Sequence, residues 1–464
     1  MDVLKDPKYG PAPVTRAIGA KQAGEADAKA QRARRAGWTW AEPSVWTDRM
    51  LTALENGVKG NVWFSLIDKV YSPANLLAAW NKVSSNKGAA GVDHVTIEMF
   101  EERAAANLKH LSEQLRSGSY RPQAIRRTFI PKPDGTQRPL GIPTVRDRVV
   151  QTALRHVLEP IFEKGFAAHS YGFRPGRGCK DALRRVDQQL KDGRRFVVDA
   201  DLKSYFDTIP HARLMERVRE KVADGRVLTL IESYLTQGVM EGLEQWTPMA
   251  GSPQGAVVSP LLANIYLDPL DRLMAAQGFE MTRYADDFVI LCRSREEAQS
   301  ALDQVKRWVE PNGLTLHPDK TRVVDVTEES FEFLGYRFEH GRRWPRQKSL
   351  GKLKETIRRK TRRTNGTSLQ QIIADVNPVL RGWFGYFKHS YQTTFGSIDG
   401  WVRRRLRSIL RKRRGSRGIS RGLDHHRWPN AYFADLGLYS LKTARDLICQ
   451  SALAENCRPE SRMR

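Results

Sequence analysis

The sequence predicts a mixed α/β body as far as about residue 340, followed by a region of basic helices. Short β-branched runs such as FVVDA, residues 196–200, alternate with longer segments whose apolar residues recur at helical spacing. Beyond residue 341 basic residues dominate: residues 342–363 hold 11 Lys or Arg and one acid, and residues 403–421 hold 10 and no acid. The chain of 464 residues is too long for one ordinary core, so several domains are expected.

The N-terminal part divides into a leader, a helical segment and a hairpin. Residues 1–45 are rich in Ala, Lys, Arg, Gly and Pro, which is typical of a flexible basic leader. Residues 48–118 have helical periodicity, interrupted by the glycine-rich loop NKGAAGVD at 86–93. In RRTFIPKPDGTQRPLGIPT, residues 126–144, the turn signal PDG separates two strand-like runs and predicts that they pair.

The rest of the body alternates between the two kinds of element. Helical spacing recurs at 145–163 and 259–274. A buried strand is predicted at the start of FVVDADLKSYFD, residues 196–207, and MTRYADDFVILC, residues 281–292, is typical of a strand, a turn and a strand.

The basic region from residue 341 onward predicts a helical module. A charge run is usually a solvated face. Here, however, arginines are interleaved with aromatic residues, and the two together can pack on bases and phosphates, which favours RNA binding by a packed module. The interleaved aromatic residues are Trp383, Phe384, Tyr386, Phe387 and Trp401, and some of them are expected to belong to the core of the module.

Charge and composition restrict the partners. A net charge of +25 and a pI near 10.1 favour a nucleic acid over a membrane surface. No apolar run has the length of a membrane span, and the N-terminus lacks the apolar core of a secretory signal. The four cysteines form no CxxC pair, so a reducing cytoplasm is expected.

Acidic residues follow two of the predicted strands. Asp286 and Asp287 lie side by side in RYADDFVIL, where the ordinary alternative is a polar turn. Asp201 follows the strand FVVDA, and Asp199 and Asp207 compete with it. Alternation puts Asp199 and Asp201 on one face, so spacing alone does not choose between them.

If the two strands are neighbours, Asp201, Asp286 and Asp287 converge. Three carboxylates repel one another unless cations neutralise them, and Mg²⁺, with Mn²⁺ as a substitute, suits such an oxygen-rich cluster. Two ions about 4 Å apart can activate a 3′-hydroxyl and stabilise the leaving pyrophosphate, which is the chemistry of a polymerase.

Seven blocks in one order resemble the reverse transcriptases encoded by group II introns. Besides DLKSYFD and YADD they are RPLGIP (138–143), SYGFRPGRG (170–178), GSPQGAVVSPLLANIYL (251–267), GLTLHPDKT (313–321) and FEFLGYRF (331–338). NPVLRGWFGYF (377–387) resembles the family's thumb and maturase domain, and HRWPNAYFADLGLYSL (426–441) its C-terminal end. The resemblance implies a right-hand polymerase fold: fingers and palm over 46–340, a helical thumb and maturase domain over 341–415, and a DNA-binding-like region over 416–464.

The resemblance also implies the roles of particular residues. In the family the D of DLKSYFD and the first D of YADD bind the ions and the second completes the site, which gives Asp201, Asp286 and Asp287 and leaves Asp199 as a supporting residue. The expected nucleotide-binding residues are Phe206 as the gate against a ribose 2′-hydroxyl, Gln254 beside the incoming nucleotide, Lys132 and Arg138 on the triphosphate, and Lys320 near the carboxylates. An ordinary core position is the alternative for Phe206, and exposed hairpin cations are the alternative for Lys132 and Arg138.

The implied function is RNA-dependent DNA synthesis joined to intron maturation. Expected partners are the group II intron RNA, template RNA, primer DNA, target DNA and dNTPs. The residues expected to contact RNA are Arg358, Arg359, Arg362, Arg363, Arg403, Arg404, Arg405, Arg411 and Arg413.

Absent motifs and open alternatives complete the expectations. After residue 420 His425, His426, Cys449 and Cys457 form no paired metal motif, which favours the lineages without the endonuclease domain, primed by an existing strand such as one at a replication fork. Two alternatives stay open: a splicing factor whose polymerase site is vestigial, and a free-standing reverse transcriptase with a cellular role such as phage defence.

Overall fold

The computed structural model describes residues 37–131, 135, 137–242, 244–364, 366–416, 418 and 422–456. Two units interleave along the chain: the first runs to Arg177 and includes Leu202–Leu273 and Arg307–Thr315, and the second comprises Gly178–Asp201, Met274–Lys306 and the chain from Leu316 onward. The predicted leader lies outside the described residues up to residue 36, whereas residues 37–45 form turns that bury Ala41 and Val45. None of the described helices combines the length and the apolar character needed to cross a bilayer.

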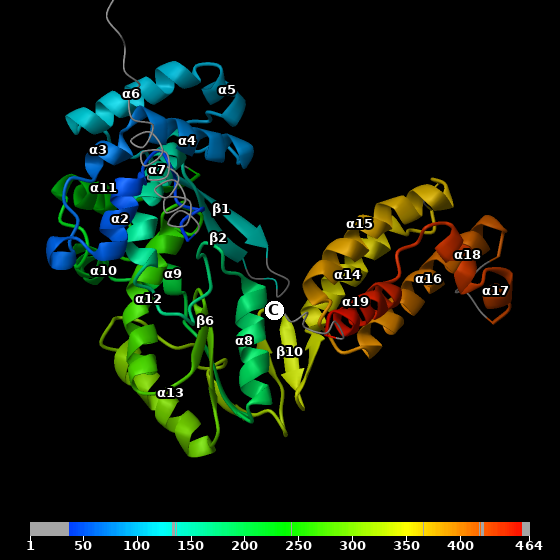
Figure 1. Cartoon of the computed structure of the whole chain (residues 1–464). Coiled ribbons are helices and arrows are strands. Elements are labelled where there is room, and N and C mark those ends of the chain that lie inside the picture. Colours follow the sequence, from blue (N-terminus) through cyan, green and yellow to red (C-terminus); the bar gives the residue numbers. More distant parts are fainter. Residues whose placement is uncertain are drawn as a thin grey trace, which may run out of the picture. The chain divides into compact units, whose positions relative to one another are not determined.

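The first unit is mostly helical (Figure 1). Its helices are α2 (Asp48–Asn56), the 3₁₀ turn η1 (Lys59–Asn61), α3 (Ile67–Val70), α4 (Pro73–Ser85), α5 (Ile97–Glu101), α6 (Ala104–Ser117), α7 (Val145–Glu163), α9 (Tyr205–Thr208), α10 (His211–Arg219), α11 (Gly225–Leu235) and most of α12 (Ser259–Ala276).

Helix α7 lies in the core of this unit, and the sequence specifies both its start and its apolar face. Thr144 caps the helix by accepting a 3.2 Å hydrogen bond from the Asp147 backbone N–H. Val149, Leu154 and Val157 are fully buried, as helical spacing predicts. Gly91, in the predicted glycine-rich loop, packs against the capping residue Thr144. A Cβ at position 91 would lie 2.7 Å from the Thr144 Cα, so a larger residue does not fit there without a shift of the backbone.

A small sheet in the first unit has the strand order β2–β1–β4–β5. The predicted hairpin is confirmed, since β1 (Ile125–Pro131) and β2 (Gln137–Ile142) pair antiparallel from Arg126↔Ile142 to Pro131↔Gln137. Most of the PDG turn between them lies outside the described residues. The sequence did not predict β4 (Val239–Glu241) and β5 (Glu244–Trp246), which extend the sheet beside β1.

The second unit contains the sheet that carries the acidic residues, in the order β6–β7–β3–β8. Its predicted strands are confirmed as β3 (Phe196–Asp201), β6 (Met281–Tyr284) and β7 (Asp287–Cys292), and β8 (Arg322–Asp325) borders β3. Helix α8 (Cys179–Lys191) contacts β6 and β7, and α13 (Arg295–Val309) lies mostly in this unit. Val197, Val198 and Ala200 of β3 are fully buried, so the strand ends are fixed by a solid core.

The C-terminal part of the second unit begins with strands and continues as helices. A three-stranded sheet joins β9 (Phe331–Phe333), β10 (Tyr336–Glu339) and β11 (Arg342–Pro345), so the expectation of helix from residue 341 is wrong for β11. The helices are α14 (Gln347–Lys360), α15 (Leu369–Phe387), α16 (Thr393–Arg413), α17 (Gly422–Arg427), α18 (Asn430–Asp435) and α19 (Leu441–Asn456), yellow to red in Figure 1. One apolar core joins α14, α15 and α16 to Trp428, Phe433 and Leu441, and this part from α14 onward is called the helical module below.

Candidate active site

Two predicted carboxylates lie directly opposite each other on neighbouring strands. In the antiparallel pair of β3 and β7, Asp201 is the partner of Asp287, and Asp199 is the partner of Val289. Side chains of directly opposed residues point to the same face, with Cα atoms about 5 Å apart. The register therefore aligns Asp201 with Asp287 and distinguishes it from Asp199, which sequence spacing alone could not do.

This face carries a cluster of acidic side chains whose positive neighbours only partly offset burial and mutual repulsion. Burial, followed by the charges of Asp199, Asp201 and Asp286, raises the pKa of Asp287 to about 7, against a smaller opposing effect of Arg346. Burial also raises the pKa of Asp199 to about 6, partly opposed by Arg322. Carboxyl groups whose pKa is raised this far are stable near neutral pH only if they are protonated or if a cation lies beside them.

In this structure Lys320 supplies one positive charge to the cluster. Its ammonium group forms an ion pair with the Asp201 carboxylate, in accord with the expectation that Lys320 lies near the acids. Within the described part of the chain, no three His, Cys, Asp or Glu side chains lie close enough together to coordinate one metal ion. The strand register thus aligns two of the three expected carboxylates, Asp201 and Asp287, while the Asp201 side chain forms its ion pair with Lys320. The donor set fits a divalent cation, because the acids outnumber the positive charges beside them.

The turn that carries Asp286 is held by a buried arginine that the sequence reasoning missed. Ala285 has a φ of 61°, a left-handed conformation that costs a non-glycine residue about 1–2 kcal/mol. The Arg283 side chain, 1% exposed, donates a 2.9 Å hydrogen bond to the Ala285 carbonyl. The opening RY of the RYADD motif was the available signal, since a basic residue inside a buried strand needs a polar partner.

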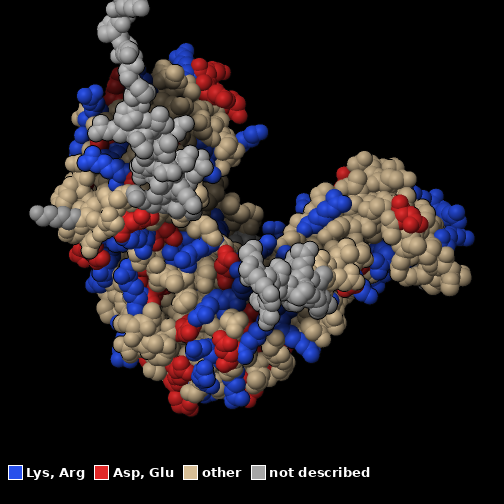
Figure 2. Space-filling view, in the orientation of Figure 1, with Lys and Arg blue, Asp and Glu red and all other residues tan. Residues whose placement is uncertain are grey.

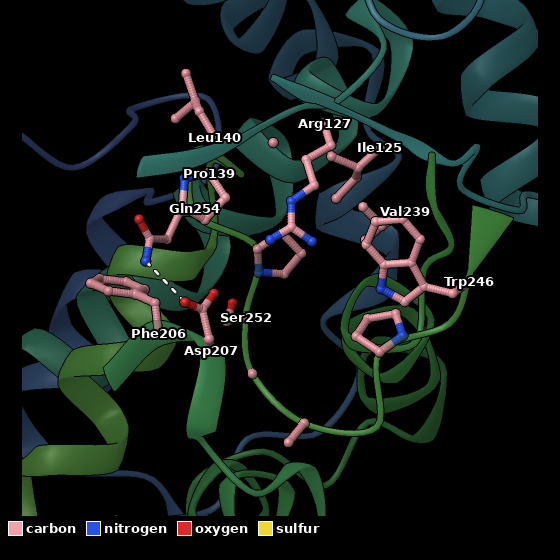
Figure 3. Close-up of a pocket in the computed structure, with 15 residues that line it drawn as sticks. Ile125, Arg127, Pro139, Leu140, Phe206, Asp207, Val239, Trp246, Ser252 and Gln254 are labelled. Carbon is pink, nitrogen blue, oxygen red and sulfur yellow. Dashed lines mark hydrogen bonds between the residues drawn. The ribbon is translucent and has the colours of Figure 1, made fainter. Parts of the chain in front are cut away.

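In the first unit, a cavity of about 310 Å³ contains two of the predicted nucleotide-binding residues. Phe206 and Gln254 line it together with Asp207 and Arg127 (Figure 3). Gln254 Nε2 lies 3.5 Å from Asp207 Oδ2, which is the long limit of a hydrogen bond. The ring of Phe206 lies beside the Gln254 side chain at the edge of the cavity in Figure 3, and the residue is only half-buried.

The loop that carries Gln254 is fixed by backbone hydrogen bonds. Ser252 N–H donates to the Phe206 carbonyl at 2.6 Å, and Gly141 N–H donates to the Gln254 carbonyl at 2.6 Å. Gly255 has a φ of +106°, and a Cβ there would lie 2.4 Å from the Gly141 carbonyl oxygen. Only glycine fits this position, which explains why a glycine follows Gln254 in the motif GSPQG.

Of the two predicted triphosphate cations, Arg138 can be located and Lys132 lies outside the described residues. Arg138 is exposed on β2, and its charge acts on Asp207. Arg127 on β1 lines the cavity instead, with its guanidinium 5.3 Å from the Trp246 ring centroid and 3.8 Å from the Glu241 carboxylate. The sequence predicted the strand that carries Arg127, but no local pattern indicated that this side chain lines the cavity.

The predicted RNA-binding arginines of the helical module fall into two groups. Those exposed on its surface are Arg358, Arg359, Arg362, Arg363, Arg404 and Arg413. Arg403 is half-buried, Arg405 donates to the Thr361 side chain at 2.7 Å, and Arg411 forms a 2.9 Å ion pair with Asp424. Figure 2 shows separate groups of Lys and Arg on the visible face of the module, between larger areas of other residues and with only small areas of Asp and Glu. Arg405 and Arg411 therefore have structural contacts that limit their access to a ligand. The exposed group is accessible to a polyanion, although Arg363 and Arg413 also donate hydrogen bonds to the Gly418 and Thr367 carbonyls.

Comparison with known proteins identifies two matching families and several similar proteins. Residues 130–338 match the family described as reverse transcriptase (RNA-dependent DNA polymerase), and residues 350–428 match the group II intron maturase-specific domain. Protein YkfC of Escherichia coli K12 is 36% identical over 314 residues, covering 59% of this chain and 82% of YkfC. The group II intron-encoded protein LtrA of Lactococcus lactis is 35% identical over 232 residues, covering 49% of this chain and 37% of LtrA. A solved partial Cas6-RT-Cas1–Cas2 complex aligns over 53% of this chain and 41% of its own, with 25% identity and a TM-score of 0.35.

The chain belongs to the reverse transcriptases, the class of RNA-dependent DNA polymerases that work with divalent metal ions on nucleic acids. Within that class its maturase-specific domain and its similarity to LtrA place it with the group II intron reverse transcriptases and maturases. The predicted fold class and the predicted kind of function are confirmed. The aligned region spans little more than a third of LtrA.

Proposed function

We propose that this chain copies RNA into DNA with Asp201, Asp286 and Asp287 as its catalytic carboxylates. The observation that supports this most directly is the opposition of Asp201 and Asp287 at the ends of β3 and β7. Asp286, in the turn immediately before β7, acts on the charge of Asp287. A vestigial site has no reason to keep such a cluster, because burying like charges together destabilises the fold.

These three carboxylates would hold two Mg²⁺ ions, or Mn²⁺ in their place. When bound, such ions activate the primer 3′-hydroxyl and stabilise the pyrophosphate that leaves. Lys320 would then exchange its ion pair with Asp201 for a contact with substrate phosphate, since cations take over the neutralisation of the acid.

The nucleotide-binding residues of the first unit would select and hold the incoming dNTP. Phe206 would exclude a ribose 2′-hydroxyl by collision, and Gln254, held rigid by its loop, would lie against the nucleotide. Arg138, exposed on β2, would bind the triphosphate together with Lys132. Arg127 adds a further positive charge on the wall of the same cavity.

The helical module would bind the parent intron RNA and stabilise its spliceable fold. The match of residues 350–428 to the maturase-specific domain and the exposed arginines support this. After splicing, the complex of protein and RNA would insert the RNA into target DNA and copy it. A free-standing reverse transcriptase without an intron partner is the competing function.

Primer extension tests the polymerase with a matched pair of variants. Asp201→Asn should abolish dNTP incorporation on an RNA template, whereas Asp199→Asn, which removes the same charge two residues earlier on the same face, should retain measurable synthesis. The double variant Asp286→Ala/Asp287→Ala should also be inactive, as should the wild type in excess chelator. Full extension by Asp201→Asn would refute the assignment.

Exon ligation tests the maturase. RNA transcribed from the gene with its flanking DNA is followed at low Mg²⁺ with wild-type protein, with Asp286→Ala/Asp287→Ala, and without protein. Faster ligation with both proteins would establish RNA binding that is separable from polymerisation. The absence of an intron in the flanking DNA, with no effect of protein, would contradict the maturase function and favour the free-standing reverse transcriptase.

A further inference from the structure

A second, larger cavity lies in the second unit between the β10–β11 hairpin and the helical module. Its volume is about 810 Å³, within the range of about 300–1,000 Å³ typical of small-molecule pockets. Arg337 and Trp344 line it from the hairpin, Lys354 from α14, and Trp401 and Arg404 from α16. Neither the carboxylate cluster nor the cavity around Gln254 shares a residue with it.

The lining of this cavity is complementary to a phosphate group. Its charged residues are Arg337, Lys354 and Arg404, and no Asp or Glu contributes to it. Arg337 is paired with Glu339 at 3.2 Å. Within the described residues Lys354 and Arg404 form no ion pair, so their charges are available to a ligand.

Trp344 and Trp401 provide aromatic surface in this cavity, and neighbouring side chains hold both rings in place. The guanidinium groups of Arg358 and Arg405 lie 5.8 and 5.6 Å from the Trp401 ring centroid, and Arg405 is itself anchored on Thr361. Trp344 lies 5.6 Å from Tyr391, centroid to centroid, and carries the Arg337 guanidinium at 5.6 Å. Fixed indoles lose little conformational entropy on binding, which favours stacking on a flat ligand.

We propose that this cavity binds one unpaired nucleotide of an RNA, with its base on the tryptophans and its phosphate on Lys354 and Arg404. A base inside a duplex is stacked between its neighbours and cannot enter a cavity of this size, whereas single-stranded or bulged RNA can extrude one. The hydroxyl groups of Thr393, Thr394 and Ser397 on the lining offer partners for a ribose 2′-hydroxyl. This inference deepens the proposed maturase function and rests on it, because most of the lining lies within the residues matched to the maturase-specific domain.

Fluorescence anisotropy with the full chain tests the inference with three probes: a labelled uridine homopolymer, the thymidine DNA homopolymer of equal length, and a blunt RNA duplex. Trp401→Leu keeps an apolar side chain against the module core and should weaken binding of the single-stranded RNA about tenfold, with duplex affinity unchanged. Trp401→Phe should restore most of the affinity. Unchanged single-strand affinity in Trp401→Leu would overturn the inference.

A charge variant keeps the test valid if Trp401→Leu does not fold. Lys354→Ala/Arg404→Ala should lower the preference for single-stranded over duplex RNA, because both side chains line the cavity. The control Lys348→Ala/Lys412→Ala removes the same charge from exposed positions of α14 and α16 outside the cavity, and should affect both RNAs equally. Equal effects of the two double variants would contradict the inference.

Further outcomes separate this inference from the proposed function. A base analogue that fluoresces when unstacked, 2-aminopurine, placed within the RNA strand should be quenched by wild type and not by Trp401→Leu. Equal binding of the DNA homopolymer would overturn the assignment to RNA. If the wild type accelerates exon ligation while Trp401→Leu keeps full single-strand affinity, only the cavity inference fails. If the wild type binds no RNA, both fail.

Discussion

Individual side chains at this site take their properties from position more than from residue type. Asp199, Asp201 and Asp287 have the same carboxyl group, yet burial and neighbouring acids raise the pKa of Asp287 to about 7 and that of Asp199 to about 6. Asp201 instead has the Lys320 ammonium group beside it. The chemistry of each carboxyl is therefore decided by its burial and by its charged neighbours.

Phe206 provides a residue-scale prediction about sugar selection. Phe206→Ala should lower the discrimination between dNTPs and NTPs about tenfold or more, because the steric block against a 2′-hydroxyl is lost. Single-nucleotide incorporation from dNTP and from NTP, compared as kcat/KM ratios, measures the change. Phe206→Tyr keeps the ring and should keep the discrimination; an unchanged ratio in Phe206→Ala would assign Phe206 to packing alone.

The buried His156 in α7 is expected to lower the stability of the fold in mild acid. Its Nδ1 lies 2.8 Å from the Asn75 side-chain oxygen, which only accepts hydrogen bonds, so the neutral ring donates. Burial lowers the pKa of His156 from 6.5 to about 4. Between these two pKa values His156 is protonated in the unfolded chain and neutral in the folded chain. The free energy of unfolding should therefore fall by about 3 kcal/mol as the pH drops from about 6.5 to about 4. Above pH 6.5 the ring is neutral in both states, so His156 makes no pH-dependent contribution there.

Urea unfolding across this pH window measures the effect. His156→Gln keeps a hydrogen-bonding side chain that does not titrate, so the difference between wild type and variant isolates the histidine. A wild-type pH profile parallel to that of His156→Gln would show that protonation of His156 is not linked to folding.

At the scale of elements, strong periodicity and short motifs were sufficient for most of the body. α7 runs from Val145 to Glu163 as its spacing predicts, and the β6–β7 hairpin surrounds the YADD turn. The strands β4, β5 and β8 to β11 were not predicted individually. They are three or four residues long, too short for alternation to show, and they are stabilised by pairing with neighbouring strands, as β4 with β1 and β8 with β3.

The helices after residue 420 complete the core of the helical module, which predicts strong coupling between them. Phe433 is fully buried in that core, so Phe433→Ala should destabilise the module by about 3–5 kcal/mol. The neighbouring Tyr432 is 36% exposed, and Tyr432→Ala should cost little. Thermal unfolding followed by circular dichroism compares the two; equal losses would mean that the core does not extend to α18.

At the scale of the whole chain, the net charge of +25 predicts salt-dependent RNA binding. Each phosphate contact releases a counterion, so affinity for the intron RNA should fall steeply between low and physiological salt. Filter binding over a salt series measures the slope, and Asp201→Asn should share it, since that change leaves the basic surface intact. An affinity that stays flat over this range would contradict phosphate binding as the main source of affinity.

The sequence by itself determined the class of protein, because motif order, charge and hydrophobic period are all local or compositional properties. It identified Asp201, Asp286 and Asp287 as candidates, but not their alignment. Only the tertiary structure decided that Asp201 rather than Asp199 opposes Asp287, that Arg283 holds the turn at Ala285, and that Arg127 lines the Gln254 cavity. Each of these depends on pairing between segments far apart in the chain, and no local pattern encodes which residue such a pairing places opposite another.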